Sequence, residues 1–245
     1  MFPLKDNIPT LRFPIVTVAL IALNVIAYFF WQKGGLTLGD PSSQHYTCHL
    51  YEYAEIPFEL THPGEQVGLQ GCPEPSAPTW LTPFTAMFMH GGLLHLGGNM
   101  LFLWIFGNNV EDSMGPVKFL LFYLLGGLAA AALQLVIGPD SQVPNLGASG
   151  AVAGVLGGYL VLFPRARVIT VIFIIFFFTI LELPAMIFLV IWFAQQALFG
   201  YFGLINPGEG GEAAEDVEGD EADPAHRVLD VVAEDPEEEH VPPEV

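Results

Sequence analysis

Long apolar segments separated by shorter polar ones make up the first 204 residues of the chain. A helix needs about 20 consecutive apolar residues to cross the roughly 30 Å of hydrocarbon in a bilayer. The pattern therefore predicts an all-α membrane protein, a helical bundle of five transmembrane spans or six. The candidate spans are Pro14–Trp31, Phe84–Phe106, Val117–Gly138, the short and glycine-rich Ser149–Pro164, and the long run Val168–Leu204, which Glu182 and Pro184 interrupt.

The last apolar run has two interpretations. Its first part, Val168–Leu181, has 14 residues, and about 21 Å of helix is short for a crossing. Pro184 suits the first turn of a new helix. We expect residues 168–183 to be interfacial or re-entrant and Ala185–Leu204 to form span five. Two crossings are the alternative, and they would move the C-terminal tail to the other side of the membrane.

Acidic charge is concentrated at the C-terminal end. The formal net charge is −19, and 15 of the 26 acidic side chains lie in residues 206–245. Binding to nucleic acid needs clustered Lys and Arg, so a nucleic acid partner is excluded. A segment this acidic cannot enter a bilayer and is expected to be disordered. The predicted organisation is a cytoplasmic N-terminus (1–13), a transmembrane domain (14–204) and a disordered acidic tail (205–245).

The few basic residues indicate which loops face the cytoplasm, because Lys and Arg of short loops stay on that side. Placing the N-terminus inside puts five of the seven basic residues in the cytoplasm, namely Lys5, Arg12, Lys118, Arg165 and Arg167. Residues 33–83 then form a long outside loop after span one. Span one shows no Ala-x-Ala cleavage site, so it is interpreted as an uncleaved anchor.

The outside loop contains Cys48 and Cys72, the only cysteines of the chain. Two thiols in an oxidising compartment favour a disulfide, which would close a loop of about 25 residues and contribute roughly 3 kcal/mol. Free thiols are an alternative. A zinc site with His49 and His62 is a third, although the spacing matches no common zinc pattern.

Span two carries three polar side chains, His90, His95 and Asn99. On a helix, His95 and Asn99 are neighbours on one face, and His90 points into a similar sector about one and a half turns away. Polar groups inside a bilayer are costly and are usually kept for function. The spacing therefore predicts a site near the outer end of span two. Hydrogen bonding to a neighbouring helix is the alternative interpretation.

A second candidate is Ser149, which stands in Gly147-Ala148-Ser149-Gly150 at the outer start of span four. Its backbone N–H belongs to the unsatisfied first turn of a helix and can face a developing oxyanion. The flanking glycines allow another backbone to approach closely. A helix-capping serine in a glycine-packed helix is the alternative.

Together, His90-x4-His95-x3-Asn99 on a second span and Gly147-x-Ser149-Gly150 on a fourth resemble the rhomboid family of intramembrane serine proteases. The long outside loop, the run Gly-Asn-Asn-Val-Glu-Asp at 107–112, and the Pro-Arg-Ala-Arg run at 164–167 agree with this resemblance. It covers roughly residues 10–204. The resemblance implies a rhomboid-like helical bundle in a lipid bilayer. It also implies a serine-type endopeptidase with no cofactor and no metal.

Residue by residue, the resemblance implies that Ser149 is the nucleophile and that His95 and Asn99 are oxyanion donors. His90, Gly147 and Gly150 would support the site. The implied substrates are transmembrane proteins, whose helices unwind near their outer ends, where glycine or proline lowers the cost of exposing backbone. We expect a multi-pass protein of a prokaryotic plasma membrane.

The family's general base, a histidine on a sixth span in an Ala-His pair followed by glycines, is not recognisable. Ala225-His226 matches the pair, but Arg227 stands where glycine is expected. In addition, Gly147, Gly150, Gly154 and Gly157 or Gly158 predict a small-residue face that receives a packed helix. The sixth span is the helix expected there.

Three explanations are open for the missing base. The sequence is a truncated or frameshifted reading of an active gene, or the protein is a catalytically inactive relative that binds transmembrane client helices, or a base comes from a second subunit or an unconventional position. A histidine-lined transporter is disfavoured, because the histidines gather near one membrane face and no internal repeat is visible.

Overall fold

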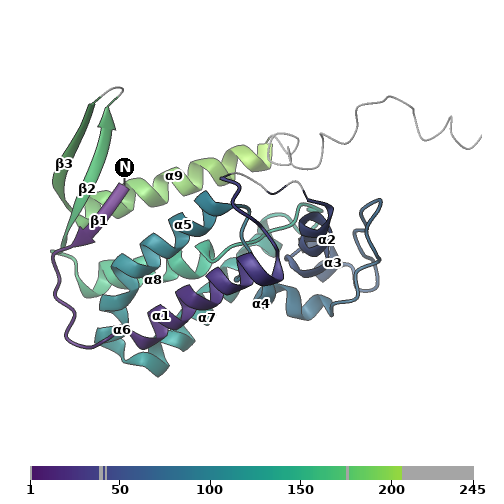
Figure 1. The fold of residues 1–245 in the computed structure, drawn as a ribbon, viewed down its shortest axis with the longest axis horizontal. Coiled ribbons are helices and arrows are strands. Elements are labelled where there is room, and N and C mark those ends of the chain that lie inside the picture. Colours follow the sequence, from purple (N-terminus) through teal and green to yellow (C-terminus); the bar gives the residue numbers. More distant parts are fainter. Residues whose placement is uncertain (1, 39–40, 42, 175–176, 206–245) are drawn as a thin grey trace, which may run out of the picture. The chain divides into compact units, whose positions relative to one another are not determined.

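A computed structural model describes residues 2–38, 41, 43–174 and 177–205. These residues belong to one compact unit, Met1–Pro207 (Figure 1). The predicted disorder of the acidic tail and the candidate His226 fall outside the described residues.

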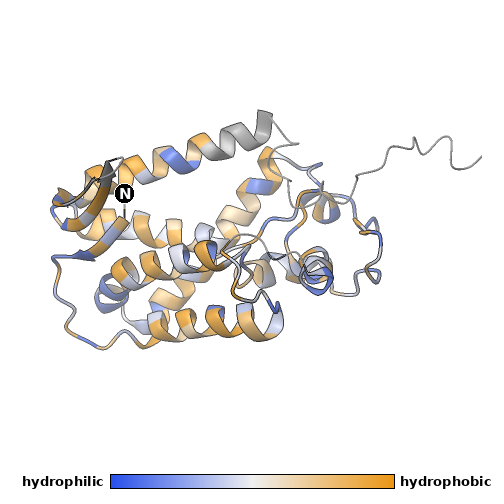
Figure 2. Cartoon of the chain, turned by 45° about the horizontal axis from the view of Figure 1, so that its top comes forward, coloured by the Kyte–Doolittle hydropathy of each residue, from blue (hydrophilic) through white to orange (hydrophobic). Residues whose placement is uncertain are grey.

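Four apolar helices correspond to predicted spans one, three, four and five. They are α1 (Ile15–Ile26), continued by a π-helical turn η1 (Ala27–Trp31), α7 (Pro116–Ile137), α8 (Ser149–Leu162) and α9 (Ala185–Ile205). Among the helices of the described residues, α7 alone is both long and apolar enough to cross a membrane by itself. Apolar residues run along all four helices (Figure 2), and many of them are exposed, including Val117, Leu125 and Val136 on α7. A predominantly helical fold is confirmed, and its exposed apolar helices fit a membrane protein.

Predicted span two is not one continuous helix. The chain forms α4 (Thr82–Ala86), an irregular segment over 87–92, α5 (Leu93–Phe102), a π-helical turn η3 (Leu103–Gly107) and α6 (Asn108–Met114). His90 therefore lies before α5 and not on it, so the helical-face argument holds for His95 and Asn99 only.

Residues 167–174 and 177–184, in the segment predicted to be interfacial or re-entrant, form two paired β-strands. Strands β2 (Arg167–Ile174) and β3 (Phe177–Pro184) pair antiparallel, with Arg167 opposite Pro184. Strand β1 (Phe2–Asp6) adds to β2, with Phe2 opposite Val171, so the strand order is β1-β2-β3. The run is rich in β-branched and aromatic residues, which favour strands. Because nearly every position is apolar, periodicity could not distinguish strand from helix.

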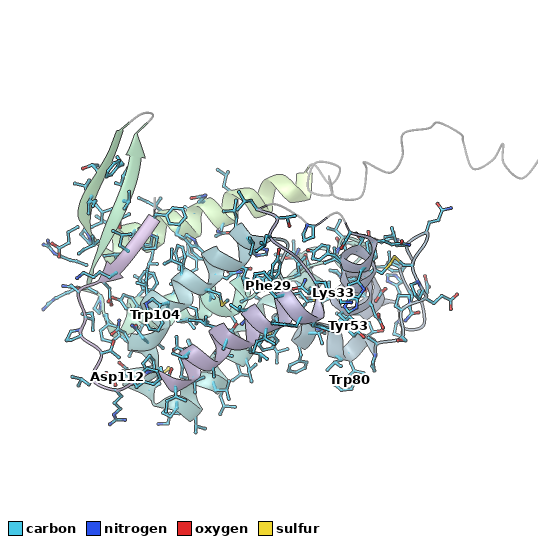
Figure 3. All side chains as sticks on the ribbon, in the orientation of Figure 1. Phe29, Lys33, Tyr53, Trp80, Trp104 and Asp112 are labelled. Atoms are coloured by element: carbon cyan, nitrogen blue, oxygen red, sulfur yellow. A yellow bond between two sulfur atoms is a disulfide. The ribbon has the colours of Figure 1, made fainter. Side chains whose placement is uncertain are left out.

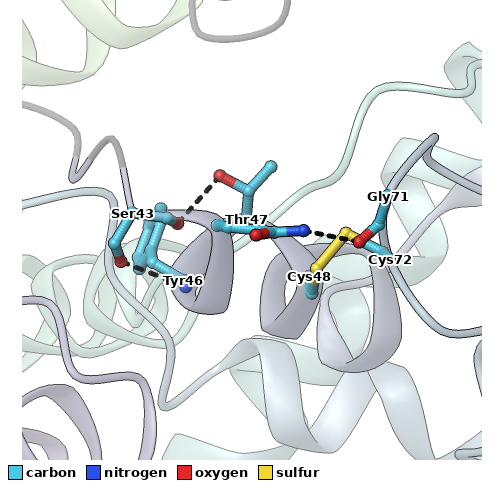
Figure 4. Close-up of a disulfide and its surroundings, with 7 residues drawn as sticks. Ser43, Tyr46, Thr47, Cys48, Gly71 and Cys72 are labelled. Carbon is cyan, nitrogen blue, oxygen red and sulfur yellow. Dashed lines mark hydrogen bonds between the residues drawn. A yellow bond between two sulfur atoms is a disulfide. The ribbon is translucent and has the colours of Figure 1, made fainter.

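The long loop after α1 is folded. It contains α2 (Gln44–Tyr53), α3 (Pro57–Thr61) and a 3₁₀ turn, η2 (Thr79–Leu81). A disulfide joins Cys48 to Cys72, with 5.3 Å between their Cα atoms, and Gln44 Nε2 donates to the Gly71 carbonyl over 2.6 Å beside it (Figure 4). The two cysteines considered as zinc ligands are thus bonded to each other.

The segments assigned to the cytoplasm by charge lie at one end of the bundle. Glu111 accepts hydrogen bonds from the backbone N–H groups of Val16 and Thr17, at 2.9 and 2.8 Å, and so caps the start of α1. Asp6 accepts hydrogen bonds from the Tyr159 hydroxyl and the Asn109 amide, both 2.6 Å long. Figure 3 shows Asp112 at this end, with Tyr53 and Trp80 of the folded loop at the opposite one.

Candidate active site

Ser149 is the first residue of α8, and close packing of α8 on α7 determines its position. A Cβ atom on Gly150 would lie 2.5 Å from the Ala130 Cβ, and one on Gly154 would lie 3.3 Å from the Gly126 Cα. Only glycine permits helix backbones to approach so closely. The small-residue face of span four therefore receives α7. The sequence predicts the sixth span at this face, whereas the structure places α7 against Gly150 and Gly154.

Gly147 joins the serine segment to α5. Its N–H donates to the Ala86 carbonyl over 2.8 Å, and its φ of 118° lies in the region that favours glycine. A Cβ atom at this position would lie 2.7 Å from His95 Nε2 and 3.7 Å from Asn99 Nδ2. His95 and Asn99 therefore both approach the chain two residues before Ser149.

The hydrogen bonding of His95 indicates which ring nitrogen carries the proton. The backbone N–H of Gly91 donates to His95 Nδ1 over 3.2 Å. Because a backbone N–H can only donate, Nδ1 is the acceptor, and the neutral ring carries its hydrogen on Nε2. The nitrogen nearest Gly147 is thus an N–H donor.

Asn99 supplies a second donor, one helical turn along α5 from His95. The residue is buried, and its Nδ2 has no hydrogen-bond partner among the described residues. An unsatisfied buried amide is costly. Two N–H groups beside the turn that precedes Ser149 are of the kind that stabilises a developing oxyanion.

His90 is placed behind His95. It is fully buried, and its ring packs edge-on against the His95 ring with 5.2 Å between centroids. Its backbone N–H donates to Gln32 Oε1 over 2.9 Å, and its carbonyl accepts from Gln32 Nε2 and from the Tyr46 hydroxyl. These contacts hold the irregular segment in place. Sequence reasoning missed Gln32, although a polar residue at the end of an apolar span was a usable signal.

A cavity of about 190 Å³ adjoins Ser149. Gly147, Ser149 and Gly150 line it, whereas His90, His95 and Asn99 do not. Its lining also includes Glu55, whose side chain is 5% exposed. Burial raises the pKa of the Glu55 carboxyl to about 7. Sequence reasoning did not single out Glu55, because nothing in a loop sequence marks a carboxylate that folds inward.

Close packing of α7 on α8 places Ser149 at the start of α8, and two N–H donors approach Gly147, two residues before it. This arrangement makes Ser149 the centre of a candidate site in a helical protein. The chain belongs to the rhomboid family, since the Rhomboid domain model matches residues 77–206, over half of its length. Members of this family are multi-pass membrane proteins.

Curated relatives agree with this assignment. The chain is 37% identical over 90 residues to Rhomboid protein 1, mitochondrial, of Saccharomyces cerevisiae, covering 35% of this chain and 26% of the relative. It is 40% identical over 81 residues to Rhomboid protease GluP of Bacillus subtilis, covering 33% and 15%. It is 40% identical over 77 residues to Rhomboid-like protein 11, chloroplastic, of Arabidopsis thaliana, covering 31% and 27%.

The chain thus aligns with about a quarter or less of the length of these relatives. No solved structure matches it. One of these relatives is named as mitochondrial and one as chloroplastic, and one comes from a bacterium. Similarity to them therefore does not identify the membrane in which this protein lies. A prokaryotic plasma membrane stays a prediction.

Proposed function

We propose that this protein is an intramembrane serine endopeptidase that cleaves transmembrane substrate helices near their outer ends. Ser149 Oγ would attack the scissile carbonyl carbon and give its proton to a general base, a role that is not assigned to any described residue. The peptide C–N bond would then break, the amine would take up a proton and leave, and water would hydrolyse the acyl-enzyme ester to free Ser149. The Nε2–H of His95, the Nδ2–H of Asn99 and the Ser149 backbone N–H would bind the oxyanion. His90, Gly147 and Gly150 would support these groups, and the substrates would be membrane proteins.

The observation that carries this proposal is the approach of His95 and Asn99 to Gly147. The approach depends on the absence of a side chain at 147 and on the one-turn spacing of His95 and Asn99. The tautomer of His95 then makes Nε2 a donor toward Gly147. Family membership adds support, because one similar relative carries the name of a protease.

A fluorophosphonate probe tests the nucleophile directly. It reacts with an activated serine and needs no substrate side chain. We expect the detergent-solubilised wild type to be labelled on Ser149 and the Ser149→Ala variant to remain unlabelled. Ser113→Ala is the matched control, since Ser113 is an exposed serine on α6 at the opposite end of the bundle, and this variant should label like the wild type.

A folded wild type that takes up no probe would overturn the peptidase proposal. The alternative would then stand, in which the protein holds transmembrane client helices at the same site without cutting them. Co-purification of a client helix with both the wild type and Ser149→Ala would be its positive sign.

A further inference from the structure

The sheet β1-β2-β3 has no role in the proposed chemistry. It lies at the end of the bundle opposite the folded loop, and β2 and β3 extend from there away from the helices (Figure 1). Its base packs on the bundle, since Val168 and Thr170 of β2 are fully buried. Farther along the strands, apolar side chains are exposed on both faces. Ile180 on one face is 56% exposed, and Leu181 on the other is 44% exposed.

The two edges of this sheet are open. Among the described residues, β1 and β3 each pair with β2 only. An open edge leaves backbone N–H and C=O groups that need polar partners, so such an edge does not occur within the hydrocarbon of a bilayer. The exposed apolar side chains, by contrast, favour lipid over water. Both requirements are met at the boundary between the hydrocarbon and the headgroups.

The face that carries Ile180 also carries basic residues near its base. Lys5 is opposite Ile169 on β2, and Arg167 is two residues before Ile169 on the same face. Asn7 holds the two segments together, because its backbone N–H donates to the Arg167 carbonyl over 3.0 Å and its Oδ1 accepts from the Arg167 N–H over 2.8 Å. Folding thus brings together two basic residues from distant parts of an acidic chain.

These basic side chains are available to a ligand. Lys5, Arg167 and the neighbouring Arg165 are exposed, and none of the three forms an ion pair within the described residues. Glu182 is on the same face, but it is two strand spacings from Lys5, about 10 Å. The group of four therefore keeps a positive net charge.

We propose that this sheet lies in the interface of the bilayer and binds anionic phospholipids, with Lys5 and Arg167 as the residues that contact the phosphate groups. The apolar side chains farther along the strands, including Ile180 and the 69% exposed Phe178, would lie beside the first carbons of the acyl chains. The open edges would find water and headgroup oxygens as hydrogen-bond partners.

Lipid fits this surface better than a second copy of the chain does. Helix α9 begins directly after β3, and its exposed residues Met186, Ile187 and Val190 continue the apolar surface of the sheet along the bundle. A second copy paired along the open edge of β3 would cover apolar side chains. Such a copy would also lie at the edge away from Lys5, whereas a lipid leaflet supplies both hydrocarbon and phosphate.

Depth-dependent quenching tests the placement of the sheet. The two cysteines of the chain are bonded to each other, so a cysteine introduced by Ile180→Cys can be labelled alone with bimane. The labelled full chain is reconstituted in liposomes that contain phosphatidylcholine with a nitroxide on the headgroup, on carbon 5 or on carbon 12. We expect strong quenching by the first two nitroxides and weak quenching by the third.

Ser113→Cys is the matched control for the label. Ser113 is exposed on α6 at the same end of the bundle and lies outside the sheet, so its label should be quenched less by the carbon-5 nitroxide. Equal quenching of the two labels would overturn the inference. Absent quenching together with energy transfer between labelled Ile180→Cys proteins, persisting on dilution with lipid, would assign the surface to a second copy.

The preference for anionic lipid is measured with the same Ile180→Cys label. The carbon-5 nitroxide is placed on phosphatidylglycerol or on phosphatidylcholine in otherwise identical liposomes, and the quenching gives the relative affinity of the two lipids for the sheet. One basic residue near an anionic surface contributes about fivefold in affinity. We expect phosphatidylglycerol to be preferred about tenfold or more.

Lys5→Gln/Arg167→Gln should reduce this preference to about twofold. Arg12→Gln/Lys118→Gln is the matched control, because it removes the same charge from two exposed residues outside the sheet, and it should retain the preference. Equal affinity for the two lipids in the wild type, or an equal loss in both double variants, would overturn the assignment of a phosphate site to Lys5 and Arg167.

Discussion

The backbone N–H of Gly91 donates a hydrogen bond to Nδ1 of His95, and this contact directs the Nε2–H of His95 toward Gly147. An imidazole in this tautomer can stabilise an oxyanion without first gaining a proton. The irregular segment before α5 thus has a chemical role in the proposed site, because a continuous helix would use the Gly91 N–H within its own hydrogen bonding.

Removing either side-chain donor should slow acylation of Ser149. We expect His95→Ala and Asn99→Ala each to lower the rate of fluorophosphonate labelling by about 10²–10³-fold, the usual loss for one oxyanion donor. His45→Ala is the control, since His45 is an exposed histidine on α2 away from the site. Labelling rates within threefold of the wild type for both donor variants would exclude them from the oxyanion hole.

Gly147 should tolerate no side chain. Gly147→Ala would set a methyl group 2.7 Å from His95 Nε2, at a φ of 118° that costs about 1–3 kcal/mol for other residues. We expect a lower melting temperature and at least a tenfold slower labelling rate. In Gly157→Ala the new methyl group would meet no atom within 4 Å, so this variant should match the wild type in both measurements.

The close packing of α7 on α8 predicts that substitutions at Gly150 and Ala130 affect stability in a coupled way. Gly150→Ala should destabilise the fold by about 1–3 kcal/mol, because its methyl group would meet the Ala130 Cβ at 2.5 Å. Ala130→Gly removes the opposing methyl group and by itself costs about 1 kcal/mol of helix propensity. In the double variant the total loss of stability should be smaller than the sum of the losses in the two single variants. Strict additivity in denaturation midpoints would contradict this contact.

Glu55 should make the fold less stable as the pH rises. Its pKa is raised in the folded state from 4.5 to about 7, so its contribution is complete below pH 4.5 and is lost as the pH rises through about 7. We expect the wild type to lose about 2 kcal/mol between pH 5 and pH 8 relative to Glu55→Gln. Burial also raises the pKa values of Asp6 and Glu59, but both groups are present in each variant and cancel in the difference. Parallel stability curves for the two proteins would rule out this assignment.

Sequence reasoning succeeded where a pattern within one segment determines the local structure. Run length located α1, α7, α8 and α9, because crossing a bilayer demands apolar length. The one-turn spacing of His95 and Asn99 predicted that they share a helix face, and α5 bears this spacing out.

The same reasoning failed where tertiary contacts decide. The strand pair β2–β3 was missed because a uniformly apolar run has no period. The partner of the glycine face was misassigned because a small-residue stripe indicates close packing without identifying the partner helix. Glu55 enters the cavity through its backbone pairing with Asn145, 90 residues further along the chain, and no local pattern encodes such a contact.

Cleavage of a transmembrane substrate tests the central proposal most directly. The full chain is reconstituted in liposomes with single-span substrate helices that carry glycine or proline near the outer end, and the products are identified by mass spectrometry. We predict a single cut near that end with the wild type and none with Ser149→Ala. The same products from both proteins, or an intact substrate beside a wild type that labels fully with fluorophosphonate, would contradict the proposal that Ser149 cleaves membrane helices.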